Sequence, residues 1–192
     1  FYNAEDGGQV NGIQAIRSPG STLKPFLYAL AFDKGLLTPK WKISDVPVNF
    51  SGYSPVNYSG EYEGMVSIEH ALINSLNVPS VKVLEAIEVP FFIEKLSEAG
   101  FSHIEKNKNN LGLSVVLGGC GVRLSELTRL YACFANNGIL QPIKWLQSDS
   151  LRQQQQTPLL SPSAAFITSD ILTKLTRPDL PKNIDNSRNL PK

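Results

Sequence analysis

The chain is organised around a Pro-Gly turn that is expected to lead directly into a helix. The turn ends at Gly20, which supplies backbone freedom, and the residues that follow show the apolar spacing of a helix. Pro25 falls in the first turn of this helix, where its missing N–H costs little. We therefore predict a helix at about 21–34, with Gly35 as its C-terminal glycine.

Ser21 and Lys24 are three residues apart and therefore share one face of the predicted helix. A serine hydroxyl becomes a nucleophile when a base takes its proton, and lysine is such a base once burial or a second cation lowers its pKa. Backbone N–H groups at the start of the helix would stabilise the oxyanion that forms when Ser21 attacks a carbonyl. The same spacing fits an N-cap serine followed by a solvated lysine, and chance produces it about once in a couple of hundred residues. On this segment alone both interpretations stay open.

Composition limits the classes of protein that the chain can represent. With 192 residues, 42% of them hydrophobic, it is long enough for one domain with a core. A net charge of +1 without clustered Lys and Arg gives no support to nucleic-acid binding, and no apolar run reaches the length of a membrane span. Cys120 and Cys133 are predicted to be buried free thiols. No Cys/His spacing predicts zinc, and we expect His70 and His103 in helices or loops, not as metal ligands.

Beyond the first helix, the sequence predicts more helices and few strands. Apolar periodicity indicates helices at 68–74, 80–87, 90–99, 126–137 and 163–176. Ser67, Ser125 and Ser161 precede three of them as expected N-terminal caps. Short strands are expected at 10–16 and 140–145.

Three stretches are predicted to be loops, each for a different reason. The stretch 36–64 is broken by Pro and Gly but rich in aromatic residues, which predicts an ordered loop that packs or lines a groove. The glycine-rich stretch 111–122 predicts a tight loop placed against another part of the chain, and it does not match a nucleotide-binding fingerprint. The glutamines at 153–156 predict a surface loop.

A second polar pair, Ser75 and Asn77, falls on the turn between two predicted helices. From such a turn Ser75 can shuttle a proton between Lys24 and a leaving amine, and Asn77 can donate a hydrogen bond to a peptide carbonyl. The two residues can equally well satisfy the helix ends, as serine and asparagine often do. The same spacing recurs at 187–189, but there it lies in a polar tail without flanking helices.

Further blocks of sequence accompany these two motifs in a fixed order. They are residues 17–26, 45–47, 71–79, 117–127, 134–138 and 177–181. Together they make the chain resemble the transpeptidase domain of the bifunctional, class A penicillin-binding proteins over nearly its whole length, with 141–160 the least similar part. Several ordered blocks are far more specific than either short motif. The resemblance implies an α/β fold of the β-lactamase/transpeptidase type.

The resemblance also implies roles for the motif residues. Ser21 would be the acylated nucleophile, Lys24 its base, and Ser75 and Asn77 the second motif, with Asn77 binding substrate and no metal or cofactor required. The implied partners are peptidoglycan stem peptides ending in D-Ala-D-Ala, whose acyl group passes to an amine on a neighbouring strand, and β-lactams, which acylate the same serine. The implied location is the extracytoplasmic (periplasmic) side of the bacterial membrane. In the parent protein we expect an N-terminal membrane anchor and a preceding glycosyltransferase domain.

The chain departs from the family in one respect. The third motif, Lys-Thr-Gly or Lys-Ser-Gly on a core strand, does not occur in it. We therefore expect residues 1–192 to be a partial transpeptidase domain without its C-terminal sheet strands. Such a chain would be mainly α-helical with a few short strands, catalytically impaired, and prone to dimerise through an exposed apolar face. Two alternatives stay open: a D,D-carboxypeptidase or β-lactamase-type hydrolase, and a non-catalytic β-lactam sensor or structural domain.

Overall fold

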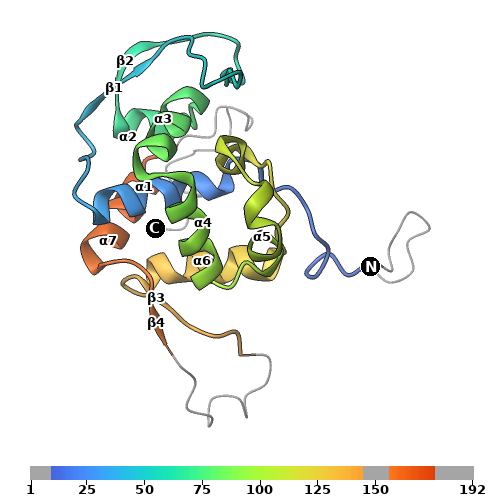
Figure 1. The fold of residues 1–192 in the computed structure, drawn as a ribbon. Helices are drawn as coiled ribbons and strands as arrows, with labels where there is room; N and C mark the ends of the chain where they lie inside the picture. Colours follow the sequence, from blue (N-terminus) through green and yellow to red (C-terminus); the bar gives the residue numbers. More distant parts are fainter. Residues whose placement is uncertain (1–9, 145–155, 176–192) are drawn as a thin grey trace, which may run out of the picture.

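Helix α1 (Lys24–Asp33) lies at the centre of the molecule, surrounded by the other helices (Figure 1). The structure is a computed structural model that describes residues 10–144 and 156–175. Every residue of α1 from Lys24 to Phe32 is buried, as expected for a helix that is apolar on all sides. It packs against α2 (Ile68–Ile73), α3 (Asn77–Ile87) and α7 (Pro162–Leu172). The predicted first helix is therefore the helix around which the core is built.

The remaining helices complete the shell around α1. They are α4 (Val89–Glu98), α5 (Ser102–Asn107) and α6 (Leu124–Ala135), with the 3-10 turns η1 (Gly20–Leu23), η2 (Lys108–Asn110) and η3 (Leu113–Leu117). Phe26 of α1 and Phe92 of α4 are fully buried, with ring centroids 6.0 Å apart. Burial of such side chains is the main favourable contribution to stability.

Two short antiparallel hairpins project from this helical body (Figure 1). In the first, β1 (Lys42–Asp45) pairs with β2 (Gly64–Ser67), in a register that places Lys42 opposite Ser67 and Asp45 opposite Gly64. In the second, β3 (Ile139–Leu140) pairs with β4 (Thr157–Pro158). The expectation of a mainly helical chain with a few short strands is confirmed for the described residues.

Several local predictions are confirmed in detail. The Ser67 hydroxyl accepts a hydrogen bond from the His70 backbone N–H, and the Ser161 hydroxyl accepts one from Ala164, so both serines are N-caps. Gly35 follows α1 with φ of +65°, the left-handed conformation of a C-terminal glycine. Both cysteines are free; Cys133 is buried and Cys120 is half-buried.

Other predictions were wrong at element boundaries. The expected strand at 10–16 is a turn in which Asn11 accepts backbone hydrogen bonds, and only Arg17 pairs with another segment, through Val122. Helix α6 begins at Leu124, not after Ser125, because the side chain of Glu126 caps the Arg123 backbone N–H at 2.8 Å.

Three further differences concern element extent. Helix α5 was missed because it is only six residues long and mostly polar, with Ile104 as its one buried side chain, so it gives no apolar periodicity. The predicted loop 36–64 contains strand β1, and α3 begins at Asn77, earlier than expected. The expected strand at 140–145 is reduced to Ile139–Leu140, and most of the glutamine stretch lies outside the described residues.

Candidate active site

Ser21 lies in the turn that immediately precedes α1. This turn is the 3-10 helix η1, so Ser21 comes before the α-helix and does not open it as predicted. Gly20 has φ of +54°, which glycine adopts without strain, and the Thr22 backbone N–H and hydroxyl both donate to the Pro19 carbonyl, at 3.2 and 2.8 Å. The turn leaves Ser21 exposed at the edge of a pocket of about 460 Å³.

The glycine-rich loop predicted at 111–122 packs against this turn. The Ser18 hydroxyl donates to the Gly118 carbonyl at 2.7 Å. Gly118 has φ of +96°, and a Cβ at this position would lie 2.7 Å from the Gly20 backbone. A side chain at Gly118 would therefore push the turn that carries Ser21, which confirms that the loop is tight and placed against another part of the chain.

Lys24 is buried, and its ammonium group is fully engaged. Its residue is only 1% exposed, and Nζ donates to the Ser75 carbonyl at 2.6 Å, the Ser75 hydroxyl at 3.1 Å and Asn77 Oδ1 at 2.7 Å. These contacts exclude the interpretation of Lys24 as a solvated lysine. Desolvation by burial lowers the pKa of Lys24 from 10.5 to about 8. A substantial fraction of this amine is therefore neutral near physiological pH.

The turn between α2 and α3 aims Ser75 and Asn77 at Lys24. Ser75 has φ of +53°, a left-handed conformation that non-glycine residues rarely adopt and that is typical of functional sites. In this conformation both its carbonyl and its hydroxyl accept from Lys24. Asn77 is the first residue of α3. Ser75 and Asn77 lie 51 and 53 residues from Lys24 in the sequence. The fold thus brings the two predicted motifs together at one amine.

Ser21 lines the same pocket as Lys24 and Ser75 but is not bonded to them. Within residues 10–144 and 156–175, the Ser21 hydroxyl makes no hydrogen bond, and the three donors of Lys24 are taken by the second motif. Catalytic hydrogen bonds are often long in a free protein and tighten when substrate binds. The structure therefore brings Lys24, Ser75 and Asn77 into direct contact, and places Ser21 beside them.

One pocket residue was missed by the sequence analysis. Tyr131 of α6 lines the pocket, and its hydroxyl donates to the Thr22 carbonyl at 2.9 Å. Burial raises the pKa of Tyr131 to about 12, so this hydroxyl stays protonated and a donor. Tyr131 lies 109 residues from Thr22, and the helical pattern gave it no role other than packing.

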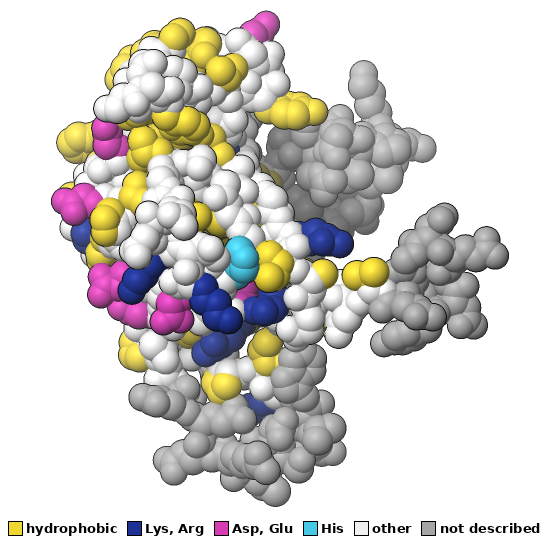
Figure 2. All heavy atoms as spheres, turned by 45° about the vertical axis from the view of Figure 1, so that its right-hand side comes forward, with side chains coloured by type: hydrophobic (Ala, Val, Ile, Leu, Met, Phe, Trp, Pro, Cys, Tyr) yellow, Lys and Arg dark blue, Asp and Glu magenta, His cyan; other side chains and the backbone are white. Residues whose placement is uncertain are grey.

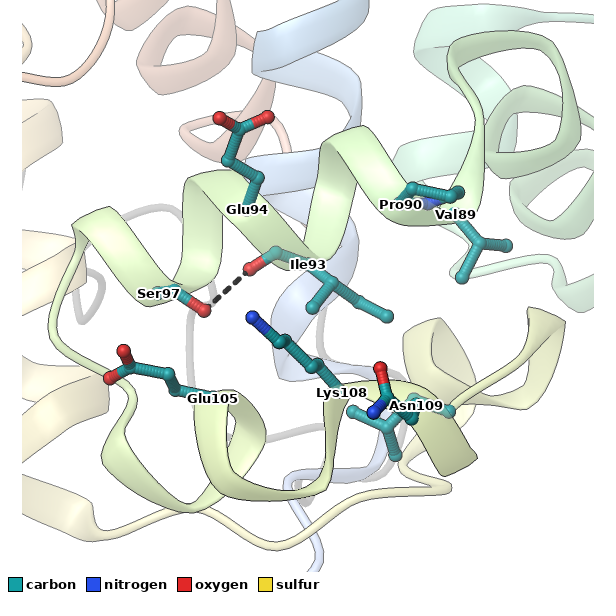
Figure 3. Close-up of a pocket in the computed structure, with 9 residues that line it drawn as sticks. Val89, Pro90, Ile93, Glu94, Ser97, Glu105, Lys108 and Asn109 are labelled. Carbon is teal, nitrogen blue, oxygen red and sulfur yellow. Dashed lines mark hydrogen bonds between the residues drawn. The ribbon is translucent and has the colours of Figure 1, made fainter.

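A second pocket, of about 440 Å³, lies between α4 and the α5–η2 segment (Figure 3). It contains none of the predicted site residues. Its charged side chains, Glu94, Glu105 and Lys108, are exposed, and the Ser97 hydroxyl already donates to the Ile93 carbonyl at 3.0 Å. On the side of the molecule that Figure 2 brings forward, Lys and Arg side chains gather next to Asp and Glu side chains, so this face has mixed charge.

Metal-binding clusters and membrane-spanning helices are both absent from the part of the chain that the structure describes. There, no three His, Cys, Asp or Glu side chains lie close enough together to hold a metal ion. His70 instead contacts Glu63, with Nε2 2.6 Å from the carboxylate. None of the helices in these ranges is long and apolar enough to cross a membrane.

Comparison with known proteins identifies the family. A family model described as the penicillin binding protein transpeptidase domain matches residues 3–180. The chain belongs to this family. The transpeptidase chain is 37% identical over 171 residues to penicillin-binding protein 1C of Escherichia coli K12, a match that covers 89% of this chain and 22% of the relative. It thus spans about a fifth of the length of that curated relative.

Solved structures of transpeptidase domains share the fold. The penicillin-binding protein PonA1 of Mycobacterium tuberculosis superposes with a TM-score of 0.74 at 20% identity, covering 84% of this chain and 48% of that one. A structure of PonA1 in complex with penicillin V matches with a TM-score of 0.72 at 19% identity, with the same coverage. At these identities the likeness shows the fold alone. The predicted transpeptidase-like α/β class is confirmed, and this chain corresponds to about half of the solved chain.

Proposed function

We propose that this chain carries the acylation site of a peptidoglycan D,D-transpeptidase, with Ser21 as the nucleophile. The observation that carries the proposal is Lys24, a buried amine of lowered pKa that lies in the same pocket as Ser21 and is held by Ser75 and Asn77. A lysine costs free energy to bury, and this cost is reasonable where a neutral amine must act as a base.

The proposed first half-reaction is acylation of Ser21. Neutral Lys24 takes the proton from the Ser21 hydroxyl as its oxygen attacks the carbonyl of the D-Ala-D-Ala bond. The resulting tetrahedral oxyanion collapses, the peptide bond breaks, and the departing amine of the last D-alanine receives a proton through the Ser75 hydroxyl. One Nδ2 hydrogen of Asn77 donates to the Val56 carbonyl at 2.7 Å, which leaves the other for a substrate carbonyl.

The proposed second half-reaction returns the enzyme to its free form. An amine on a neighbouring stem peptide attacks the acyl ester, Ser21 leaves as the alcohol, and a cross-link forms between two strands. β-Lactams would acylate the same hydroxyl and block this cycle. These partners place the site on the extracytoplasmic side of the bacterial membrane, where peptidoglycan is assembled.

We further propose that residues 1–192 are part of one transpeptidase domain and need the rest of it for full activity. This proposal is supported by the missing third motif and by the match to only 48% of a solved chain. The loss of one oxyanion-hole donor alone costs about 10²- to 10³-fold in rate. We also propose that the apolar lining of the Ser21 pocket, which includes Leu172 and Leu175, favours dimerisation of this stretch alone.

Covalent labelling with a fluorescent penicillin tests the proposal. The 192-residue chain and a form extended past Lys192 are labelled, and the modified residue is located by mass spectrometry. We expect the extended form to label on Ser21 and the shorter chain to label much more slowly. Ser21→Ala should abolish labelling, whereas Ser59→Ala, at an exposed serine away from the pocket, should not.

The lifetime of the acyl-enzyme separates the related functions. A transpeptidase keeps the penicilloyl ester for long periods, whereas a β-lactamase-type hydrolase releases it to water within the assay. Failure of the extended form to label at all would contradict the enzyme proposal and favour a structural role.

A further inference from the structure

The start of helix α3 is capped by a residue from a distant loop. Leu76 precedes the helix and provides no side-chain cap. Instead, Asn57 Oδ1 accepts from the first two backbone N–H groups of the helix, those of Asn77 at 2.8 Å and Val78 at 3.4 Å. These donors have no partner within a helix, so Asn57 fixes where α3 begins, and with it the position of the Asn77 backbone.

The residue before Asn57 orients the side chain of Asn77. The Val56 carbonyl accepts from Asn77 Nδ2 at 2.7 Å, and Asn77 Oδ1 accepts from Lys24 Nζ at 2.7 Å. A side-chain amide has an oxygen acceptor at one end and a nitrogen donor at the other. Because the Val56 carbonyl binds the nitrogen of Asn77, the oxygen faces the opposite side. Val56 therefore turns the acceptor end of Asn77 toward the ammonium group of Lys24.

Asn57 is itself held in place by a buried carboxylate. Its Nδ2 lies 2.9 Å from both oxygens of Asp45 and 2.9 Å from the Glu61 carbonyl. Asp45, the last residue of β1, is fully buried and also accepts from the Glu63 backbone N–H at 2.9 Å. A buried carboxylate is tolerated only when donors surround it, so this cluster is costly to disturb.

In this loop a polar residue is buried while its apolar neighbours are exposed. Val56 is 53% exposed and Tyr58 fully exposed, whereas the polar Asn57 between them is only 4% exposed. A buried polar residue between exposed apolar neighbours indicates a specific bonding role and not general packing.

We propose that the Val56–Asn57 segment, anchored by Asp45, is a positioning element that holds Asn77 in the orientation in which it binds Lys24. Neither residue lines the Ser21 pocket, so both are positioning residues. Its consequence for acylation rests on the function proposed above, but the placement of Asn77 can be measured without any reaction.

Nuclear magnetic resonance of the 192-residue chain tests the placement directly. In the side-chain amide of Asn77, assigned by its loss in Asn77→Ser, the one Nδ2 hydrogen that the Val56 carbonyl accepts should exchange slowly with water in the unchanged protein. In Asn57→Ala we expect this exchange to accelerate at least about tenfold. Asn49→Ala is the matched control: Asn49 lies in the same loop, but its side chain bonds only locally, to Ser54 and Gly52.

Penicillin acylation of the extended form tests the consequence. Asn57→Ala should acylate about 10- to 100-fold more slowly, as expected when a catalytic group is displaced by about an ångström, with far-UV circular dichroism unchanged. Asn49→Ala should acylate at the original rate. If the unchanged extended form does not acylate, the proposed function fails, and the exchange measurement alone decides the placement.

A pair of variants keeps the test decisive if Asn57→Ala does not fold. Asn57→Asp places a second carboxylate against that of Asp45. In the double variant Asp45→Asn with Asn57→Asp, an amide donor at position 45 again faces a carboxylate acceptor at position 57. We expect the double variant to recover slow Asn77 exchange and at least about tenfold in acylation over Asn57→Asp. Unchanged Asn77 exchange in the single variants, or a double variant no better than Asn57→Asp, would overturn the proposal.

Discussion

The two pockets are nearly equal in size but differ in what their polar groups do. The pocket beside α1 measures about 460 Å³ and contains Lys24, which is 1% exposed and bonded to two residues of another turn. The pocket between α4 and α5 measures about 440 Å³, and its Lys108 is exposed, as are Glu94 and Glu105 (Figure 3). Their volumes alone would not distinguish the two pockets. The buried and hydrogen-bonded charge supports the proposed catalytic role of the first pocket, and the second pocket has no such group among its exposed charged side chains.

The largest difference in effect is expected between substitutions of Lys24 and of Lys108. Lys24→Met should reduce penicillin acylation of the extended form at least about 100-fold, because the proposed base is lost while an apolar side chain of similar length fills the site. Lys108→Met should leave the rate within about twofold. Acylation is followed by stopped-flow or gel densitometry, with melting temperature as a folding check. Equal losses in both variants would remove the distinction between the pockets.

The pH dependence of acylation is the next largest effect. Because burial lowers the pKa of Lys24 to about 8, the neutral amine increases as pH rises through that value. The acylation rate should therefore rise about tenfold between pH 7 and pH 9 and then level off. Lys108→Met should keep the same profile. A rate independent of pH over this interval would contradict Lys24 as the base.

Outside the pocket, a buried carboxylate is expected to contribute to the stability of the fold. Glu69 accepts from Lys40 at 2.6 Å and Lys174 at 2.7 Å, and these bonds lower its pKa from 4.5 to about 2. The stabilisation is present above about pH 4.5 and is lost as pH falls toward 2. Glu69→Gln should lower the free energy of unfolding by about 1–2 kcal/mol at pH 7, since both lysines are partly screened by solvent.

Chemical denaturation at pH 7 and pH 3 measures the contribution of Glu69 to the free energy of unfolding. Glu69→Gln should differ less from the unchanged protein at pH 3 than at pH 7. The pair of Lys95 and the exposed Glu98, 2.7 Å apart, supplies the control, since Glu98→Gln should change stability by less than about 0.5 kcal/mol. An equal loss in both variants would show that burial does not separate them.

The smallest predicted effect concerns the turn that carries Ser21. Tyr131→Phe removes the hydrogen bond to the Thr22 carbonyl and should slow acylation about three- to fivefold, the net value of one such bond. Tyr58→Phe, at a fully exposed tyrosine, should have no effect. A rate unchanged in Tyr131→Phe would mean that the turn is held by the Gly118 loop alone.

Local signals in the sequence were sufficient for the central helix, the Ser67 and Ser161 caps and the positions of both motifs. Each depends on residues close in the chain: apolar spacing, a capping hydroxyl three residues from its donor, or a serine three residues before a lysine. Helix α5 was missed because six residues with a single buried side chain, Ile104, give no apolar periodicity.

The way in which the two motifs meet depends on the tertiary fold. The sequence allowed Lys24 to be solvated, and only packing on all sides of α1 buries it and directs its amine to Ser75 and Asn77. Asn57, 20 residues from Asn77, lies in a loop with no periodic pattern. Its role depends on a hydrogen bond between distant segments, and such a bond leaves no trace in local spacing because it forms only when the chain has folded.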